Sequence, residues 1–162
     1  MIRSATPDDV PAIARLIRGL AEYEKLSSHC VFEDSDLRAQ LFGARPGAEV
    51  LMAEEEGRAV GFALFFQSFS TFLARPGLYL EDLFVLPSER GRGHGKALFQ
   101  RLAQIAVERG YGRFEWSVLN WNEPSIRFYR AMGSKPLDEW TMHRIEGDAL
   151  RALAEGRPLA AE

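Results

Sequence analysis

The amino-acid sequence predicts one α/β domain with a mixed, mostly antiparallel sheet and helices on both faces. The first half of the chain has the pattern of a strand, two helices and two successive strands, and the second half alternates strands with helices before two short final strands. The chain has 162 residues, 46% apolar and 27% charged, without an internal linker, which fits a single soluble domain. We expect that domain to span residues 1–162, with a frayed tail over about 155–162.

The N-terminal half begins with a short strand at residues 2–5 and a clear helix start. Thr6-Pro7-Asp8-Asp9 combines a capping threonine, a proline at the first helical position and acidic residues in the first turn. Apolar residues then recur at helical spacing as far as about Lys25. The other elements expected in this half are a helix at 34–42 and strands at 50–53 and 59–66.

The C-terminal half alternates the two kinds of element, and glycines mark the helix ends. One helix is expected at 95–109, ending at Gly110, and another at 122–132, ending at Gly133. The remaining elements expected here are strands at 79–86, 113–119, 135–137 and 140–145 and a last helix near 148.

Charge and composition exclude several classes of protein. The net charge of −3 gives no global basic field for nucleic acid. No apolar stretch approaches the roughly 20 residues that a membrane span needs, and the first residues lack a signal-peptide core. Cys30 is the only cysteine, and the three histidines are too scattered to suggest a metal site. A cytoplasmic protein without metal is the expectation.

A basic, glycine-rich segment follows the apolar strand at 79–86. It consists of Arg90, Gly91, Arg92, Gly93, His94, Gly95 and Lys96 and leads directly into a helix. Glycines allow close approach of a ligand to the backbone, and a helix N-terminus attracts anions, so the segment suits a pyrophosphate. A Walker loop would need Ser or Thr at Ala97, and a Rossmann fingerprint beginning at Gly91 would need glycine at Lys96. The pattern that fits is Arg-x-x-Gly-x-Gly.

Two further groups of residues have the chemistry of a catalytic site. Asn122, Ser125 and Tyr129 share one face of the expected helix, where a phenol could act as a proton donor; the alternative is a tyrosine that only packs. Glu81 and Asp82 are adjacent in an apolar strand, and neighbours on a regular strand point to opposite faces unless a bulge intervenes. The alternative for this pair is a salt bridge at the sheet edge.

These motifs together resemble the GNAT (GCN5-related) N-acetyltransferases. The glycine segment resembles the acetyl-CoA loop of that family, and Asn122 and Tyr129 match its spacing after a strand. The similarity extends from Ile2 to about Leu153. A narrower resemblance, to the diamine (spermidine/spermine N1-) and thialysine acetyltransferase branch, is carried by the segments 20–24, 79–82, 116–118, 121–125 and 128–129.

The resemblance implies a GNAT fold with a splayed cleft for acetyl-CoA, and a role for each motif. Backbone groups of Leu83, Phe84 and Val85 would hold the acetyl and pantetheine portion, beside a strand bulge whose N–H faces the thioester carbonyl. The segment from Arg90 to Lys96 would hold the pyrophosphate. Further roles would fall to Asn122 and Ser125 beside the pantetheine, to Tyr129 as the acid that protonates the CoA sulfur, and to Tyr23, Glu24, Glu81 and Asp82 as the amine site. One carboxylate of the Glu81–Asp82 pair would be the base, directly or through water; our interpretation favours Glu81, with Asp82 as the alternative.

The expected activity is therefore direct transfer of acetyl to a primary amine of a small diamine-like or lysine/thialysine-like substrate. Polyamine-acting relatives tend to have an Asp before the Tyr-Leu-Glu-Asp strand, where this chain has Thr71 and its neighbours, and this favours a shorter amine or an amino-acid-like amine such as thialysine. The alternatives are acetylation of a protein lysine or N-terminus and, in a different class, a CoA-binding sensor without turnover. A homodimer is expected from the resemblance alone.

Overall fold

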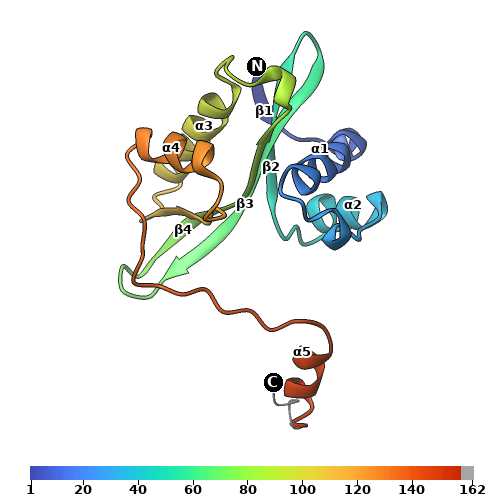
Figure 1. Ribbon diagram of the computed structural model, residues 1–162, viewed down its shortest axis with the longest axis vertical. Helices are drawn as coiled ribbons and strands as arrows, with labels where there is room; N and C mark the ends of the chain where they lie inside the picture. Colours follow the sequence, from blue (N-terminus) through green and yellow to red (C-terminus); the bar gives the residue numbers. More distant parts are fainter. Residues whose placement is uncertain (158–162) are drawn as a thin grey trace. The chain divides into compact units, whose positions relative to one another are not determined.

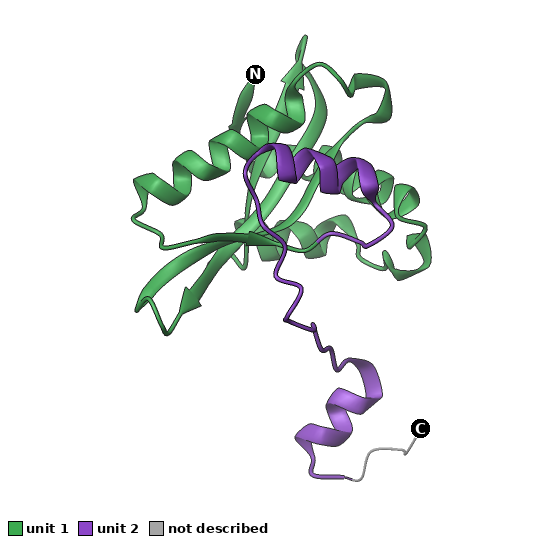
Figure 2. Ribbon diagram, turned by 60° about the vertical axis from the view of Figure 1, so that its left-hand side comes forward, with its two compact units in different colours: residues 1–117 green, residues 118–162 purple. Residues whose placement is uncertain are grey.

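The structure is a computed structural model that describes residues 1–157, and its chain divides into two compact units. The first unit comprises Met1–Ser117 and the second Val118–Glu162 (Figure 2). The single domain expected from the sequence stays a prediction. The frayed tail expected at 155–162 lies, from residue 158 onward, outside the described residues. Among residues 1–157, no helix combines the length and apolar character needed to cross a membrane.

A five-stranded sheet forms the centre of the first unit. Its strands lie side by side in chain order: β1 (Ile2–Ser4), β2 (Glu49–Glu55), β3 (Arg58–Ser70), β4 (Arg75–Val85) and β5 (Phe114–Trp116). The first four strands pair antiparallel, whereas β5 is parallel to β4. The prediction of a mixed, mostly antiparallel sheet is confirmed.

Helices cover both faces of this sheet, as expected. The helices α1 (Val10–Tyr23) and α2 (Asp34–Phe42) lie on one side, and α3 (His94–Glu108) lies on the other (Figure 1). Short 3₁₀ turns at Pro7–Asp9, Ser27–His29 and Pro87–Glu89 connect them to their neighbours. Apolar residues at helical spacing in α1, among them Ile13 and Leu16, pack with alternate strand residues such as Met52, Phe62 and Phe84 in one core.

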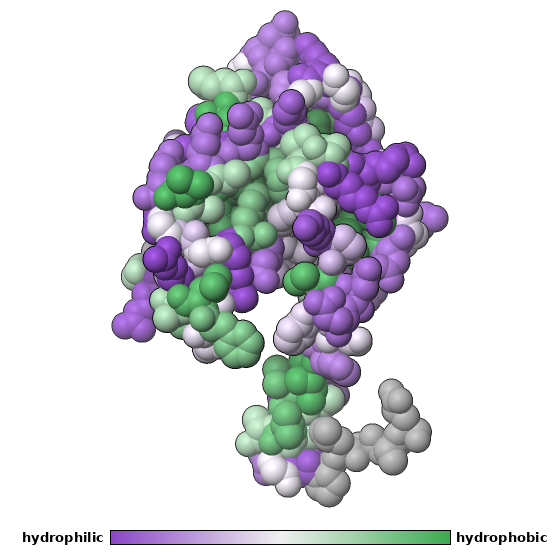
Figure 3. Space-filling view, turned by 90° about the vertical axis from the view of Figure 1, so that its left-hand side faces the viewer, coloured by the Kyte–Doolittle hydropathy of each residue, from purple (hydrophilic) through white to green (hydrophobic). Residues whose placement is uncertain are grey.

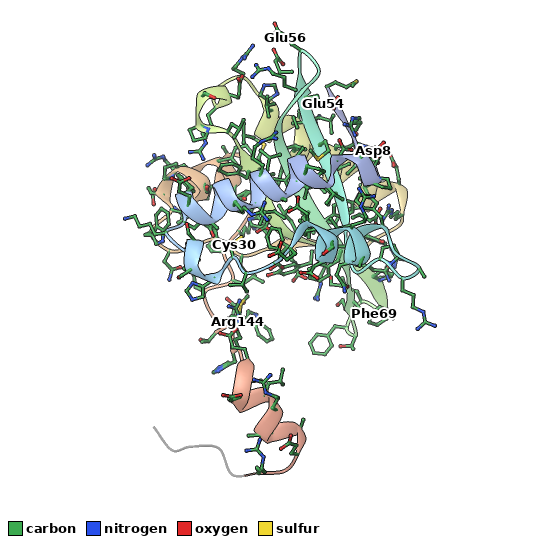
Figure 4. All side chains as sticks on the ribbon, turned by 90° about the vertical axis from the view of Figure 1, so that its right-hand side faces the viewer. Asp8, Cys30, Glu54, Glu56, Phe69 and Arg144 are labelled. Atoms are coloured by element: carbon green, nitrogen blue, oxygen red, sulfur yellow. The ribbon has the colours of Figure 1, made fainter. Side chains whose placement is uncertain are left out.

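The hairpin of β3 and β4 is longer than the sequence pattern indicated. The two strands continue to Ser70 and from Arg75, so that Thr71 lies at the tip of the hairpin. Phe69, labelled in Figure 4, lies near this tip and is 59% exposed. Expecting the strands to end near 66 and begin near 79 was wrong, because paired backbone groups can extend a hairpin through polar residues.

The second unit contains α4 (Glu123–Ala131) and α5 (Gly147–Ala154). The strands predicted at 135–137 and 140–145 are absent there, and the reason is physical. A strand needs a neighbour to satisfy its backbone, and residues 118–157 contain no other strand. Alternating apolar residues of this segment remain exposed, Trp140 at 73% and Met142 at 65%. Apolar side chains also gather on α5 (Figure 3).

Candidate active site

A β-bulge separates the two neighbouring carboxylates of β4. Phe65 of β3 pairs with Leu80, and Leu64 pairs with Asp82, so Glu81 is the extra residue. The bulge that the Glu81–Asp82 pair required for a common site is therefore present. Because Asp82 lies opposite Leu64, it is on the same face of the sheet as Phe62, the face covered by α1.

Asp82 lies in an acidic, partly buried group that we call the carboxylate cluster: Glu24, Glu81 and Asp82. Burial raises the pKa of Asp82 to about 7, and the charges of Glu81 and Glu24 contribute to the increase. Burial also raises the pKa of Glu24, which follows the end of α1. In the described part of the chain no ion pair forms to any of the three, so the alternative of an edge salt bridge is wrong.

One edge of β4 is unpaired next to this cluster. The pairing of β4 with β5 ends at Leu80 and Trp116, whereas β4 continues to Val85. Backbone groups of residues 81–85 on that side therefore have no partner strand in the first unit. Leu83, Phe84 and Val85, predicted to hold the pantetheine, all lie on this free stretch, which an extended ligand can pair with as an added strand. The carbonyl of Val85 already accepts a hydrogen bond from Arg90 Nε at 3.1 Å.

The glycine segment forms the turn that leads into α3. Gly91 and Gly93 have φ of +78° and +88°, and Gly93 is the N-cap of α3. Both glycines face open space, so a ligand can approach their backbone. The first turn of α3, from His94 to Lys96, presents N–H groups without helical acceptors, and this suits an anion. These features fit a pyrophosphate.

The arginines of this segment, however, contact the protein itself. The Arg90 guanidinium lies 4.4 Å from the centre of the Tyr23 ring, besides its bond to Val85. Arg92 forms ion pairs with Glu89 at 2.5 Å and with Glu55 at 2.7 Å. Both guanidinium groups therefore have partners within the protein, and the role of Arg90 and Arg92 toward the pyrophosphate stays a prediction. Glu55 and Glu89 were missed; the three-residue spacing of Glu89 and Arg92 was the only local signal for either.

Tyr23 and His94, the histidine of the glycine segment, also have defined contacts. Tyr23, predicted in the amine site, stacks with Arg90 and so contacts the glycine segment. His94 is buried, and its Nε2 lies 3.7 Å from Glu55 without a hydrogen bond. No group of three or more His, Cys, Asp or Glu suited to a metal occurs among residues 1–157.

The other predicted site residues belong to the second unit. Asn122 is the N-cap of α4, buried, and its side-chain oxygen accepts a hydrogen bond from the Ser125 N–H at 3.4 Å. Asn122 therefore caps α4. Tyr129 lies two turns further on, with its ring 5.2 Å from that of Phe128. The roles of Asn122, Ser125 and Tyr129 toward acetyl-CoA stay predictions.

Comparison with known proteins agrees with this geometry. Residues 17–133 match the acetyltransferase (GNAT) family. The chain is 40% identical to a thialysine N-epsilon-acetyltransferase of Bos taurus, over 95% of this chain and 96% of that protein. It is 34% identical to an L-ornithine N5-acetyltransferase of Arabidopsis thaliana, over 94% of this chain and 86% of that protein.

Solved structures show the same fold. An integron cassette protein from the mobile metagenome of V. cholerae superposes with a TM-score of 0.82 at 27% identity, covering 96% of this chain and 97% of that one. Enzymes of this family use acetyl-CoA as co-substrate. The chain belongs to the GNAT family and is an acetyl-CoA-dependent N-acetyltransferase.

Proposed function

We propose that this enzyme transfers acetyl directly from acetyl-CoA to a primary amine of a small diamine-like or lysine/thialysine-like substrate. The observation that carries the proposal is the carboxylate cluster, Glu24, Glu81 and Asp82, beside the unpaired edge of β4. Within residues 1–157 these three carboxylates have no cationic partner, and this favours a ligand that brings its own positive charge. The free edge beside them favours an extended ligand such as pantetheine.

Proton removal from the amine is the first chemical requirement. An alkylammonium has a pKa of about 10.4, so it must lose a proton before it can attack a carbonyl. The raised pKa of Asp82, about 7, supports this residue as the proton acceptor. A carboxylate whose pKa lies near neutral pH is a stronger base than one with an ordinary pKa. The sequence favoured Glu81 as the base, and Glu81, which is exposed, remains the alternative. It would accept the proton either directly or through a water molecule. In this proposal Glu81 and Glu24 attract the cation.

The thioester end of the site needs a donor for the developing oxyanion and an acid for the sulfur. The bulge at Glu81 disrupts the regular β4 ladder, which supports a role for a backbone N–H there as the donor. We assign protonation of the departing CoA sulfur to Tyr129, and contacts with the pantetheine to Asn122 and Ser125. Direct transfer is preferred because Cys30, the only cysteine, lies in the segment before α2 and not in any of these motifs.

The choice of amine rests on the relatives and not on Thr71. The named substrates of the relatives, thialysine and L-ornithine, both carry an amine on an amino-acid side chain. Thr71 lies beyond Arg75, which is six residues from Glu81 along β4, or about 20 Å at 3.3 Å per residue. The missing acid at Thr71 therefore has little bearing on chemistry at Glu81 within one chain. A homodimer is proposed from the family resemblance alone.

Steady-state kinetics over spermine, spermidine, putrescine, lysine, ornithine, thialysine and a histone-tail peptide tests the proposal. We expect the highest kcat/KM with the amino-acid amines. Asp82→Asn should lower kcat/KM for the amine strongly, and Glu81→Gln less, while acetyl-CoA affinity changes little in both. Activity confined to the peptide would replace this reading with protein acetylation. Loss of activity in Glu81→Gln alone would return the role of base to Glu81.

A further inference from the structure

Arg92 is the centre of a charge network behind the glycine segment. Its guanidinium contacts Glu89 of the preceding 3₁₀ turn and Glu55 at the end of β2. Glu89 also lies 3.6 Å from Arg58 at the start of β3, and Glu55 lies 3.7 Å from His94. Glu54 and Glu56, which flank Glu55, mark this β2–β3 hairpin in Figure 4. The network therefore joins the hairpin to the turn that begins α3.

Burial decides whether Arg92 can leave this network for a ligand. The Glu89 side chain is only 10% exposed, and its contact with Arg92 is short. Without Arg92, Glu89 would retain only the longer contact with Arg58, and a buried carboxylate with a poor partner is costly. Glu55 would then also be released from Arg92. Two carboxylates left with only their longer contacts would then repel the phosphates that Arg92 had moved to bind.

We propose that Arg92 is a positioning residue, held by Glu55 and Glu89, which fixes the backbone of residues 91–93 in the shape that receives the pyrophosphate and does not itself contact phosphate. The inference rests on the proposed assignment of residues 90–96 to the pyrophosphate. Arg92 lies between Gly91 and Gly93, which both have positive φ. Because glycine has no Cβ, this stretch of backbone is adaptable in the absence of a restraint. Two ion pairs to different elements provide that restraint.

The sign of the effect at Glu55 distinguishes the two roles of Arg92. If Arg92 were a phosphate ligand, Glu55→Gln would remove a competitor and tighten binding of CoA. If Arg92 is a positioning residue, Glu55→Gln, Glu89→Gln and Arg92→Gln should all weaken binding, each by roughly tenfold, the size of one lost charge-assisted hydrogen bond. Calorimetry with free CoA measures this. Unchanged or tighter binding in Glu55→Gln would overturn the proposal.

A phosphate-free ligand separates positioning from general damage. Acetylpantetheine lacks the pyrophosphate, so its KM as acetyl donor should be the same in wild type and in the three variants. An equal loss with both donors would overturn the proposal. Glu108→Gln is the matched control, because it removes an exposed pair with Arg101 on α3, outside the segment, and should leave CoA binding unchanged. Should Glu89→Gln fail to fold, the better exposed Glu55 decides the test.

The same measurements keep this inference apart from the assignment on which it rests. If wild-type enzyme used CoA and acetylpantetheine thioesters with equal KM, residues 90–96 would not be a pyrophosphate site, and the assignment itself would be wrong. If wild type strongly preferred acetyl-CoA but the Glu55 and Arg92 variants were indistinguishable from it, only the positioning role would be wrong.

Discussion

Replacing Asp82 by asparagine should stabilise the folded protein at alkaline pH and have little effect at acid pH. The native state holds the Asp82 proton up to about pH 7, whereas the unfolded chain releases it near its ordinary pKa of about 3.9. Between these values the unfolded state binds fewer protons than the native state, so the free energy of unfolding falls as pH rises. Asparagine has no titratable proton, so the free energy of unfolding of the variant does not decrease in this way as pH rises.

The size of the effect follows from the pKa. A native pKa of about 7 against about 3.9 corresponds to about 4 kcal/mol at full ionisation, which is the upper limit. Local relaxation and the hydrogen-bonding needs of the new amide reduce it. We expect Asp82→Asn to gain about 2–3 kcal/mol over wild type at pH 8.5 and close to nothing at pH 4.

Urea unfolding at pH 4, 6 and 8.5 provides the measurement, with equal m-values required for the comparison. Asp138→Asn is the control, because Asp138 is exposed and the same chemical change there should leave the stability difference near zero at every pH. A variant less stable than wild type at pH 8.5, or a gain that does not grow with pH, would refute the assignment of a buried, easily protonated carboxyl to Asp82. The stabilised variant should have lost activity, because the buried carboxyl that lowers stability is also the proposed base.

Three further predictions concern other parts of the molecule. Gly93→Ala should weaken CoA binding through strain at φ +88°. Gly110→Ala, at φ +67° at the other end of α3, should destabilise the fold similarly and leave the Kd for CoA unchanged. Calorimetry in which both variants bind CoA equally well would contradict this prediction. Tyr129→Phe should lower kcat roughly 10²-fold with acetyl-CoA affinity retained, and a wild-type kcat across the pH range would reduce Tyr129 to a packing role. Asp9→Asn should cost about 1 kcal/mol at neutral pH, because the Arg3 hydrogen bond lowers the pKa of Asp9 to about 2 and Arg3 is partly exposed. That stability is present above the unfolded pKa of about 3.9 and is lost as pH falls through about 2, so in chemical unfolding the cost should be roughly halved at pH 3.

The parts of the fold that the sequence predicted are those fixed by local chemistry. The turn into α3 was found because glycine at positive φ and a helix start both leave marks within a few residues, as at Gly93. The acidic pair in β4 indicated a bulge, because two adjacent carboxylates need one to share a site.

The parts that the sequence did not predict depend on partners far along the chain. The ion pair between Arg92 and Glu55 was not predicted, because the two residues are 37 positions apart and nothing in the sequence near either one indicates the other. The alternating pattern around Trp140 has the period of a strand. A strand forms only where another strand is available to pair with it, and the local pattern does not show whether such a partner exists. The length of the β3–β4 hairpin depends in the same way on backbone pairing.

One extra residue in β4 accounts for the position of both halves of the candidate site in the first unit. In a regular register Asp82 would lie opposite Ala63 and point toward the α3 side; with Glu81 inserted it lies opposite Leu64, on the α1 side where Glu24 also lies. A bulge also bends its strand, and pairing with β5 stops at Leu80, immediately before it. The same insertion therefore brings the carboxylates together and frees the strand edge beside them, so the carboxylate cluster and the unpaired edge of β4 have a common structural cause.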